Sequence, residues 1–147
     1  MWSIGQCLEH LCVANEVYLP PLSNALAGQE PAAIEEIRPG WLGRWFIRNY
    51  IEPSAATKRA KAPKTIAPGL TRIAPDILER FLRANEEARE FVRRAAPYDV
   101  NRIRFKNPFI AALRFSVGTG LEILTRHERR HLLQAERIRA LSDFPAA

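Results

Sequence analysis

The sequence of 147 residues is poor in the features that mark membrane and secreted proteins. It contains two cysteines, and no apolar run reaches the length of a bilayer span, because Glu9, His10 and Glu16 interrupt the most apolar N-terminal stretch. No basic segment precedes that stretch, so we read no secretory signal. Cys7 and Cys12 are five residues apart and face different sides of an expected helix, which disfavours a disulfide. We therefore expect a cytoplasmic protein in a reducing compartment, without a membrane partner.

The sequence also lacks an alternating strand pattern and an internal repeat. Hydrophobic residues make up 47% and charged residues 26%, a balance that is typical of a globular protein and excludes wholesale disorder. The formal net charge is +6, from 22 basic and 16 acidic residues. The length fits one domain, residues 1–147, with a single core. We predict a single all-α domain.

The first predicted helix begins almost at the first residue. Ser3 and Gln6 form a capping-box pattern, with Trp2 placed to pack onto Cys7. The pair Pro20-Pro21 is expected to end or kink this helix. A short helix is predicted over residues 41–50. Residues 52–69 form a connection rich in Pro, Ala and Lys, which is long enough to be a crossover between two helices that are not antiparallel.

Two further helices are predicted in the second half of the chain. One opens with Pro75 in its first position, buries a stripe at helical spacing and closes at Pro97; the stripe is Ile77, Phe81, Ala84, Ala88, Phe91 and Ala95. The last and longest is expected to be capped by Asn107-Pro108 and to run to about Leu141. Gly118 and Gly120 lie inside it and are expected to permit a close helix contact or a bend.

The three histidines of the chain are candidate metal ligands. His127 and His131 are four residues apart, so both imidazoles lie on one face of a helix and can reach the same ion. Heptad steps place them in an apolar seam with Val117, Leu124 and Ile138. His10 lies on the apolar face of the first helix. A buried imidazole needs a partner, which a shared ion would supply. The alternative is ordinary core histidines that are hydrogen-bonded to other helices.

Several segments together carry a family resemblance. They are the internal His10, the basic connection ending in Lys61-Ala62-Pro63-Lys64, the helix from Asp76, the segment Tyr98-Asp99-Val100-Asn101, and Asn107-Pro108-Phe109 leading to His127-Glu128-Arg129-Arg130-His131-Leu132-Leu133-Gln134-Ala135. With these segments the chain resembles the DinB-like superfamily over essentially its whole length, and the final run is the specific part. The resemblance implies a four-helix bundle with a long crossover connection. It also implies a divalent metal held by one histidine of the second bundle helix and two of the last, here His10, His127 and His131.

The chain departs from this family pattern at its start. The first bundle helix should precede Met1-Trp2-Ser3, and the sequence has no residues for it. Either the true start lies upstream, or the chain is a three-helix remnant. A missing helix would leave an apolar groove exposed, which marks a partner site or an aggregation liability. The helix over residues 41–50 is one candidate to fill the groove. We expect the chain to self-associate, as a homodimer.

The same residues satisfy a competing motif. His127-Glu128-Arg129-Arg130-His131 matches HExxH, in which two histidines bind zinc and the glutamate is the general base of a metalloprotease. The longer metzincin form needs glycine and histidine where this chain has Gln134 and Arg137. Glu128 is expected to point toward the flank of the bundle and to pair with neighbouring arginines. We therefore prefer the DinB-like interpretation.

The ligand set predicts the chemistry. Three neutral histidines leave coordination positions open for water or substrate, as in catalytic sites. The resemblance implies thiol-dependent transferases and isomerases or metal-dependent hydrolases. A low-molecular-weight thiol activated at the ion gives a transferase, and activated water gives a small-molecule hydrolase. Imidazole suits zinc, nickel and iron alike. Cys7 is either a fourth ligand or a small core residue. Gln134 either holds a ligating histidine in place through a hydrogen bond or is an ordinary polar residue of the bundle.

Two function classes without catalysis stay open at this point. Basic residues of the connection, near aromatic residues in the sequence, could bind nucleic acid; they are Lys58, Arg59, Lys61 and Lys64, with Trp41, Trp45 and Tyr50. We disfavour this reading, because the basic stretch of residues 126–139 is interleaved with acidic residues and forms no face of one sign. A catalytically silent interaction module is the other alternative, which fold resemblance does not separate from an enzyme.

Overall fold

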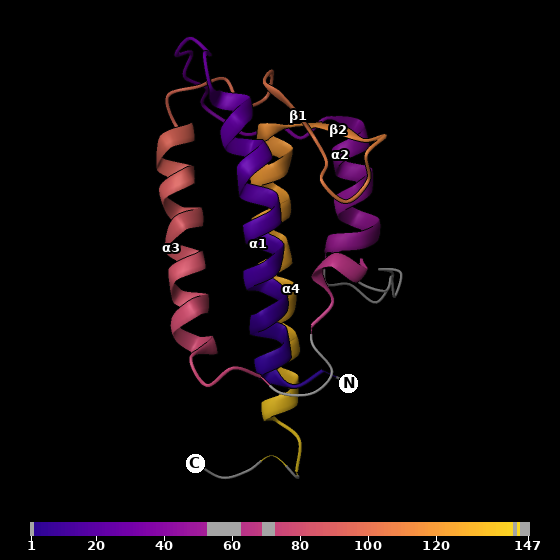
Figure 1. Cartoon of the computed structure of the whole chain (residues 1–147). Helices are drawn as coiled ribbons and strands as arrows, with labels where there is room; N and C mark the ends of the chain where they lie inside the picture. Colours follow the sequence, from indigo (N-terminus) through magenta and orange to yellow (C-terminus); the bar gives the residue numbers. More distant parts are fainter. Residues whose placement is uncertain (1, 53–62, 69–72, 143, 145–147) are drawn as a thin grey trace.

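The computed structural model describes residues 2–52, 63–68, 73–142 and 144. Helix α1 (Ile4–Leu26) lies between α3 (Ile77–Ala95) and α4 (Val117–Arg139), and a short helix α2 (Trp41–Phe46) lies on the other side of α1 from α3 (Figure 1). The fold is therefore mostly helical, as predicted. No helix in the described part of the chain is both long and apolar enough to cross a membrane.

Helix α1 begins as the sequence predicts and ends later than predicted. Ser3 is the N-cap, and its side chain and that of Gln6 form both bonds of the capping box. The helix continues through Pro20 and Pro21 to Leu26, so the prolines do not end it, which was one of the two predicted outcomes. Proline removes backbone donors within a helix. Here the apolar residues on both sides of the pair, Leu19, Leu22 and Leu26, are buried in the core, and that burial holds the last turns in helical form.

Most of the connection predicted at residues 52–69 lies outside the described residues, so its role as a crossover stays a prediction. After α2, one π-helical turn η1 (Ile47–Ile51) completes the segment predicted at residues 41–50. A single 3-10 turn η2 (Lys64–Ile66) is described within the connection. Glu16 on α1 pairs with Arg80 on α3, and Ser23 accepts a bond from Arg94, so both helices run in the same direction.

The predicted stripe of helix α3 is half buried and half partly buried, the latter at Ile77, Phe81 and Ala88. Ala84, Phe91 and Ala95 are buried, and the helix ends two residues before Pro97. Its N-cap is Asp76, so Pro75 precedes the helix and does not occupy its first position. Proline fixes φ equally well just before a helix begins. This explains why the helix starts about two residues after the position that Pro75 predicted.

The segment before α4 was predicted wrongly. Strands β1 (Arg104–Lys106) and β2 (Arg114–Ser116) form an antiparallel pair, in which Phe105 faces Phe115, and both phenylalanines are buried. The side chain of Asn107 does accept two backbone N–H bonds, but it caps the turn between the strands, not the last helix. That helix begins at Val117 with Ser116 as its N-cap. Strands of three residues are too short to give an alternating pattern.

Two glycines let α4 lie close to its neighbours, as predicted. A Cβ atom on Gly120 would lie 2.6 Å from Cδ2 of Leu22 and 3.0 Å from Cε1 of Phe105. A Cβ atom on Gly118 would lie 3.0 Å from Cγ2 of Ile37. This close approach of Gly120 to α1 fixes the distance between α1 and α4, and that distance determines whether histidines on the two helices can meet.

One face between α3 and α4 carries exposed leucines. Asn85 on α3 donates to a carboxylate oxygen of Glu128 on α4 at 2.9 Å. The helices run in opposite directions (Figure 1), so the next turn beyond this bond carries Leu82 on one helix and Leu132 on the other, and these are 58% and 59% exposed. The segment of α2 and η1 packs against α4 and β2 and does not cover this face.

Candidate metal centre

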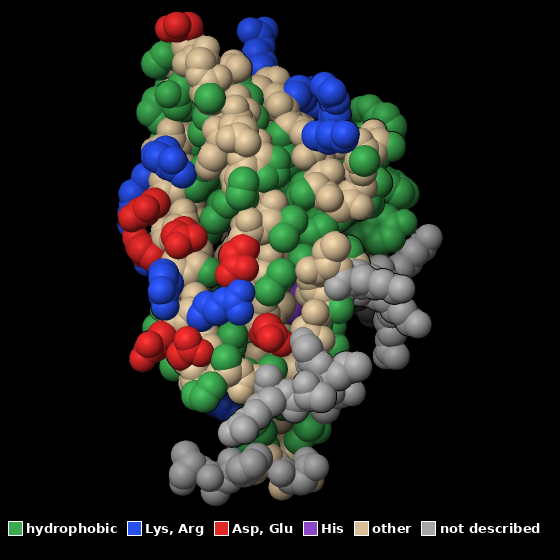
Figure 2. All heavy atoms as spheres, viewed as in Figure 1, with side chains coloured by type: hydrophobic (Ala, Val, Ile, Leu, Met, Phe, Trp, Pro, Cys, Tyr) green, Lys and Arg blue, Asp and Glu red, His purple; other side chains and the backbone are tan. Residues whose placement is uncertain are grey.

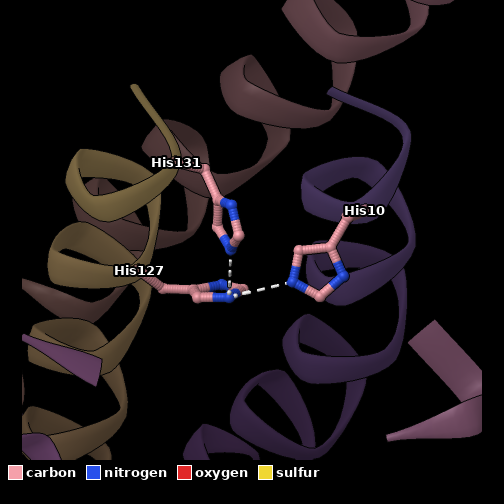
Figure 3. A group of neighbouring side chains, drawn as sticks. All are labelled: His10, His127 and His131. Carbon is pink, nitrogen blue, oxygen red and sulfur yellow. Dashed lines mark hydrogen bonds between the residues drawn. The ribbon is translucent and has the colours of Figure 1, made fainter. Parts of the chain in front are cut away.

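Three imidazoles meet where α1 crosses α4. His10 comes from the second turn of α1, and His127 and His131 come from adjacent turns of α4 (Figure 3). The Nε2 atom of His127 lies 3.1 Å from Nε2 of His10 and 3.2 Å from Nε2 of His131. His10 and His131 are buried, and His127 is partly buried. The structure thus brings together all three histidines that the sequence singled out.

The separations between these nitrogen atoms suit one small ion. Zinc holds imidazole nitrogens at about 2.0–2.1 Å in tetrahedral geometry, which places neighbouring ligand atoms about 3.3 Å apart. The two measured distances of 3.1 and 3.2 Å are close to that value. Among the described residues, the group of histidine, cysteine and carboxylate atoms that could share an ion here is this triad, with its ligand atoms within 4.8 Å of one another.

The outward-facing nitrogens of two rings are held by neutral acceptors. Nδ1 of His10 lies 2.6 Å from the carbonyl oxygen of Ile66, and Nδ1 of His131 lies 3.1 Å from Oε1 of Gln134. An oxygen acceptor requires a proton on Nδ1, so Nε2 of each ring carries a bare lone pair that faces His127. Gln134 therefore supports a candidate ligand, which was one of its two predicted roles.

The proton count of the neutral triad leaves one lone pair without a donor. Nε2 of His127 is the common neighbour of the other two Nε2 atoms, and the single proton it can carry can be directed to only one of them. One of the two short contacts therefore joins a lone pair to a nitrogen that offers it no proton. An ion that accepts all three lone pairs removes this conflict, so the donor set fits a divalent metal.

The surroundings keep all three rings neutral. Burial lowers the pKa of His10, and it lowers that of His131 to about 4, aided by the positive charge that His10 and Arg130 can carry. The pKa of His127 lies well below its usual value, because burial is joined by repulsion from His131, His10 and Arg130. A neutral imidazole is the form that binds metal. No proton therefore has to be displaced from the inward-facing lone pairs of His10 and His131 at neutral pH.

Sequence reasoning missed Trp2 as a part of this centre. Its indole stacks on His131, with ring centroids 5.7 Å apart and planes inclined by 13°, and it lies 5.0 Å from the centroid of His10. The side chain is partly exposed, so it forms a wall between the triad and solvent at the start of α1. The capping box gave the only sequence signal, because it places Trp2 one residue before the N-cap and hence beside the first turns of the helix.

The structure selects one of the two roles considered for Cys7 and changes the role expected for Glu128. Cys7 is a free, buried thiol whose pKa is raised to about 11 by burial, and it does not belong to the triad's ligand group. It is a core residue. Glu128 is partly buried and bonded to Asn85, so the expected pairing with neighbouring arginines is wrong. Burial raises the pKa of its carboxyl group. Glu128 faces α3, because it follows His127 by about 100° around α4.

The nucleic-acid alternative receives no support from the face seen in Figure 2. Acidic and basic side chains lie side by side there over α3, where Glu86 pairs with Arg89 and Arg93. A surface that binds a phosphate backbone needs a patch of one sign. The basic residues Lys58, Arg59 and Lys61 of the predicted patch lie outside the described residues.

Comparison with known proteins identifies a family. The family model described as the DinB superfamily matches residues 1–135, which include the three histidines and Gln134. No curated protein and no solved structure matches the chain.

Proposed function

The chain belongs to the DinB superfamily, and we propose that it is a metal-dependent enzyme acting on small molecules, with His10, His127 and His131 as the ligands of one divalent ion. The observation that carries this proposal is the convergence of three Nε2 atoms, two of which are oriented from behind by neutral hydrogen-bond acceptors. Zinc, nickel and iron are all compatible with three imidazoles.

When bound, a divalent ion held by neutral ligands alone would keep its +2 charge and would acidify a thiol or a water molecule beside it. The protein residues supply position and exclusion of water. Ile66 and Gln134 fix the ring orientations, and Trp2 shields one side of the triad. We propose a low-molecular-weight thiol as the co-substrate and an S-transferase reaction, with hydrolysis of a small molecule as the second candidate.

A metalloprotease fits these residues less well. The HExxH mechanism needs the glutamate as a general base beside the ion. The carboxylate of Glu128 is instead bonded to Asn85 on α3, on the flank of α4 away from η1. This bond supports the thiol or small-molecule reaction over peptide hydrolysis.

Elemental analysis of tag-free protein, purified without added metal, tests the proposal. We expect about one divalent transition metal per chain in the wild type and loss of that metal in His131→Ala, since two imidazoles alone seldom retain an ion. Glu136→Ala, an exposed change on the same helix, is the control. Full metal occupancy in His131→Ala would exclude the triad. The metal-loaded wild type should also accelerate conjugation of a small thiol to a halogenated or maleate-type acceptor, and His10→Ala should abolish that rate.

A further inference from the structure

Two arginines on α4 reach toward η1 but find different partners there. Arg126 makes a 2.5 Å bond to Glu52 and a 2.7 Å bond to Glu122. Arg130, one turn further along the same face, reaches only the carbonyl oxygen of Tyr50, at 3.4 Å. The guanidinium of Arg126 is thus neutralised by two carboxylates, whereas that of Arg130 bonds to a backbone dipole.

The charge of Arg130 is partly removed from water. The residue is partly buried, and in the part of the chain that the structure describes no carboxylate lies within ion-pair distance of it. Removing a cation from water without pairing it is costly, and a guanidinium has five donors to satisfy. The bond to Tyr50 uses one of these donors, so the other N–H groups of the guanidinium are available to a ligand.

Arg130 also lies beside the candidate metal centre. It follows His127 by three residues and directly precedes His131, so it lies within one helical turn of both α4 histidines. The acidic residue between them in the sequence, Glu128, is bonded to Asn85 on α3. With neutral outer partners on the rings, a bound divalent ion and Arg130 would together carry three positive charges. Among the described ion pairs, none joins a carboxylate to Arg130.

We propose that Arg130 is an anion-binding residue of this centre and that the small molecule bound there carries a carboxylate group. The planar guanidinium matches a carboxylate with two parallel hydrogen bonds, and the anion offsets both the ion and the arginine. The inference rests on the proposed function, which supplies the ion. It adds the charge class of the ligand and the residue that selects it.

Two thiols of similar size separate the carboxylate from the thiol contribution. Mercaptoacetate and 2-mercaptoethanol both offer a thiol for an ion, but only the first carries a carboxylate. Titration of the Co²⁺-loaded full chain, followed by the visible absorption of cobalt, measures both affinities. We expect the wild type to bind mercaptoacetate at least about tenfold more tightly, the usual effect of one charge-assisted hydrogen bond.

Matched variants assign this preference to one side chain. Arg130→Gln should lose the preference for mercaptoacetate while keeping its affinity for 2-mercaptoethanol. Arg129→Gln makes the same change of charge at the exposed neighbouring position and should keep the preference. A test without mutation accompanies these variants: acetate should displace 2-mercaptoethanol from the wild type at much lower concentration than neutral acetamide does.

The outcomes distinguish the two levels of the proposal. Equal affinity of the wild type for both thiols would overturn the role of Arg130 and leave the metal function standing. Loss of the preference in Arg129→Gln to the same extent would also overturn it, because a general positive field would then be the cause. Failure of the wild type to bind Co²⁺, or of both thiols to change its spectrum, would overturn the proposed function itself.

Discussion

The Nδ1 atom of His10 lies 2.6 Å from the carbonyl oxygen of Ile66, a residue 56 positions further along the chain. Ile66 belongs to the single turn η2 and is buried. The contact joins the connection between η1 and α3 to a candidate metal ligand, and it fixes the tautomer that turns Nε2 of His10 toward α4. Gln134 does the same for His131 from within α4 itself. The following predictions test these and related contacts.

Removing the outer partner of His131 should weaken metal binding without unfolding the protein. In Gln134→Leu the ring loses the acceptor that fixes its tautomer, and we expect metal affinity to fall about 10–100-fold. Competition with a coloured chelator measures the affinity. Arg137→Leu, which also replaces a polar α4 residue, is the control, and its exposed side chain should matter little. Unchanged affinity in Gln134→Leu would show that the bond between Gln134 and His131 has no part in binding.

Stability of the metal-free protein should fall with acidity. Burial lowers the pKa of His131 to about 4 from its usual value of 6.5, so between these values the unfolded chain binds a proton that the folded chain excludes. The free energy of unfolding should therefore be level with respect to this group above pH 6.5 and decline as the pH falls toward 4. Urea unfolding at several pH values measures it. Carboxylates titrate in the lower part of this range, so the comparison is with His131→Gln, which should lose less stability.

Replacing Glu128 should separate a small-molecule enzyme from a protease. Because the carboxylate is bonded to Asn85 and is not needed to deprotonate a thiol at an ion, Glu128→Gln should leave thiol conjugation within a few-fold of wild type. A protease that lost its general base would slow by about 10²–10⁴-fold. Initial rates of both reactions, measured on protein of equal metal content, decide between them. Peptide cleavage that disappears in this variant would overturn the proposed function.

A methyl group at Gly120 should destabilise the fold. The added Cβ would lie 2.6 Å from Cδ2 of Leu22, a fully buried side chain that has little room to move. Overpacking of this kind costs about 1–3 kcal/mol, which outweighs the gain of about 1 kcal/mol that alanine brings to a helix interior. Thermal and urea unfolding of Gly120→Ala should show the loss. Gly40→Ala, where a Cβ meets nothing within 4 Å, should be nearly neutral.

The homodimer that the sequence suggested stays a prediction, and the exposed leucines are the place to test it. Leu82 and Leu132 lie one turn beyond the bond between Asn85 and Glu128 on α3 and α4, and each is more than half exposed. If a second copy covers them, Leu132→Glu should shift the protein toward the monomer in sedimentation equilibrium. Trp41→Glu changes a side chain that is 75% exposed on α2 and should leave the association unchanged. A wild type that is monomeric at all concentrations would contradict the prediction.

Local sequence signals determined the helices and the face that each histidine occupies. The capping box of Ser3 and Gln6, the stripe from Ile77 to Ala95 and the four-residue spacing of His127 and His131 each act within one or two turns, where periodicity is decisive. The prediction that Asn107 caps the last helix was wrong because it also rested on a local signal. Its side chain caps backbone N–H groups in a helix and in a hairpin turn alike, and only the pairing of Phe105 with Phe115 selected the hairpin.

What only the tertiary structure decided are the partners of these residues. The sequence alone predicted three candidate ligands, but the carbonyl of Ile66, the indole of Trp2 and the amide of Asn85 became neighbours of His10, His131 and Glu128 through packing over long sequence separations. Likewise, Arg126 and Arg130 look equivalent in the sequence, and the position of Glu52 beyond η1 neutralises one of them and not the other. Periodicity places a side chain on a face, whereas its electrostatic environment depends on what the rest of the chain brings to that face.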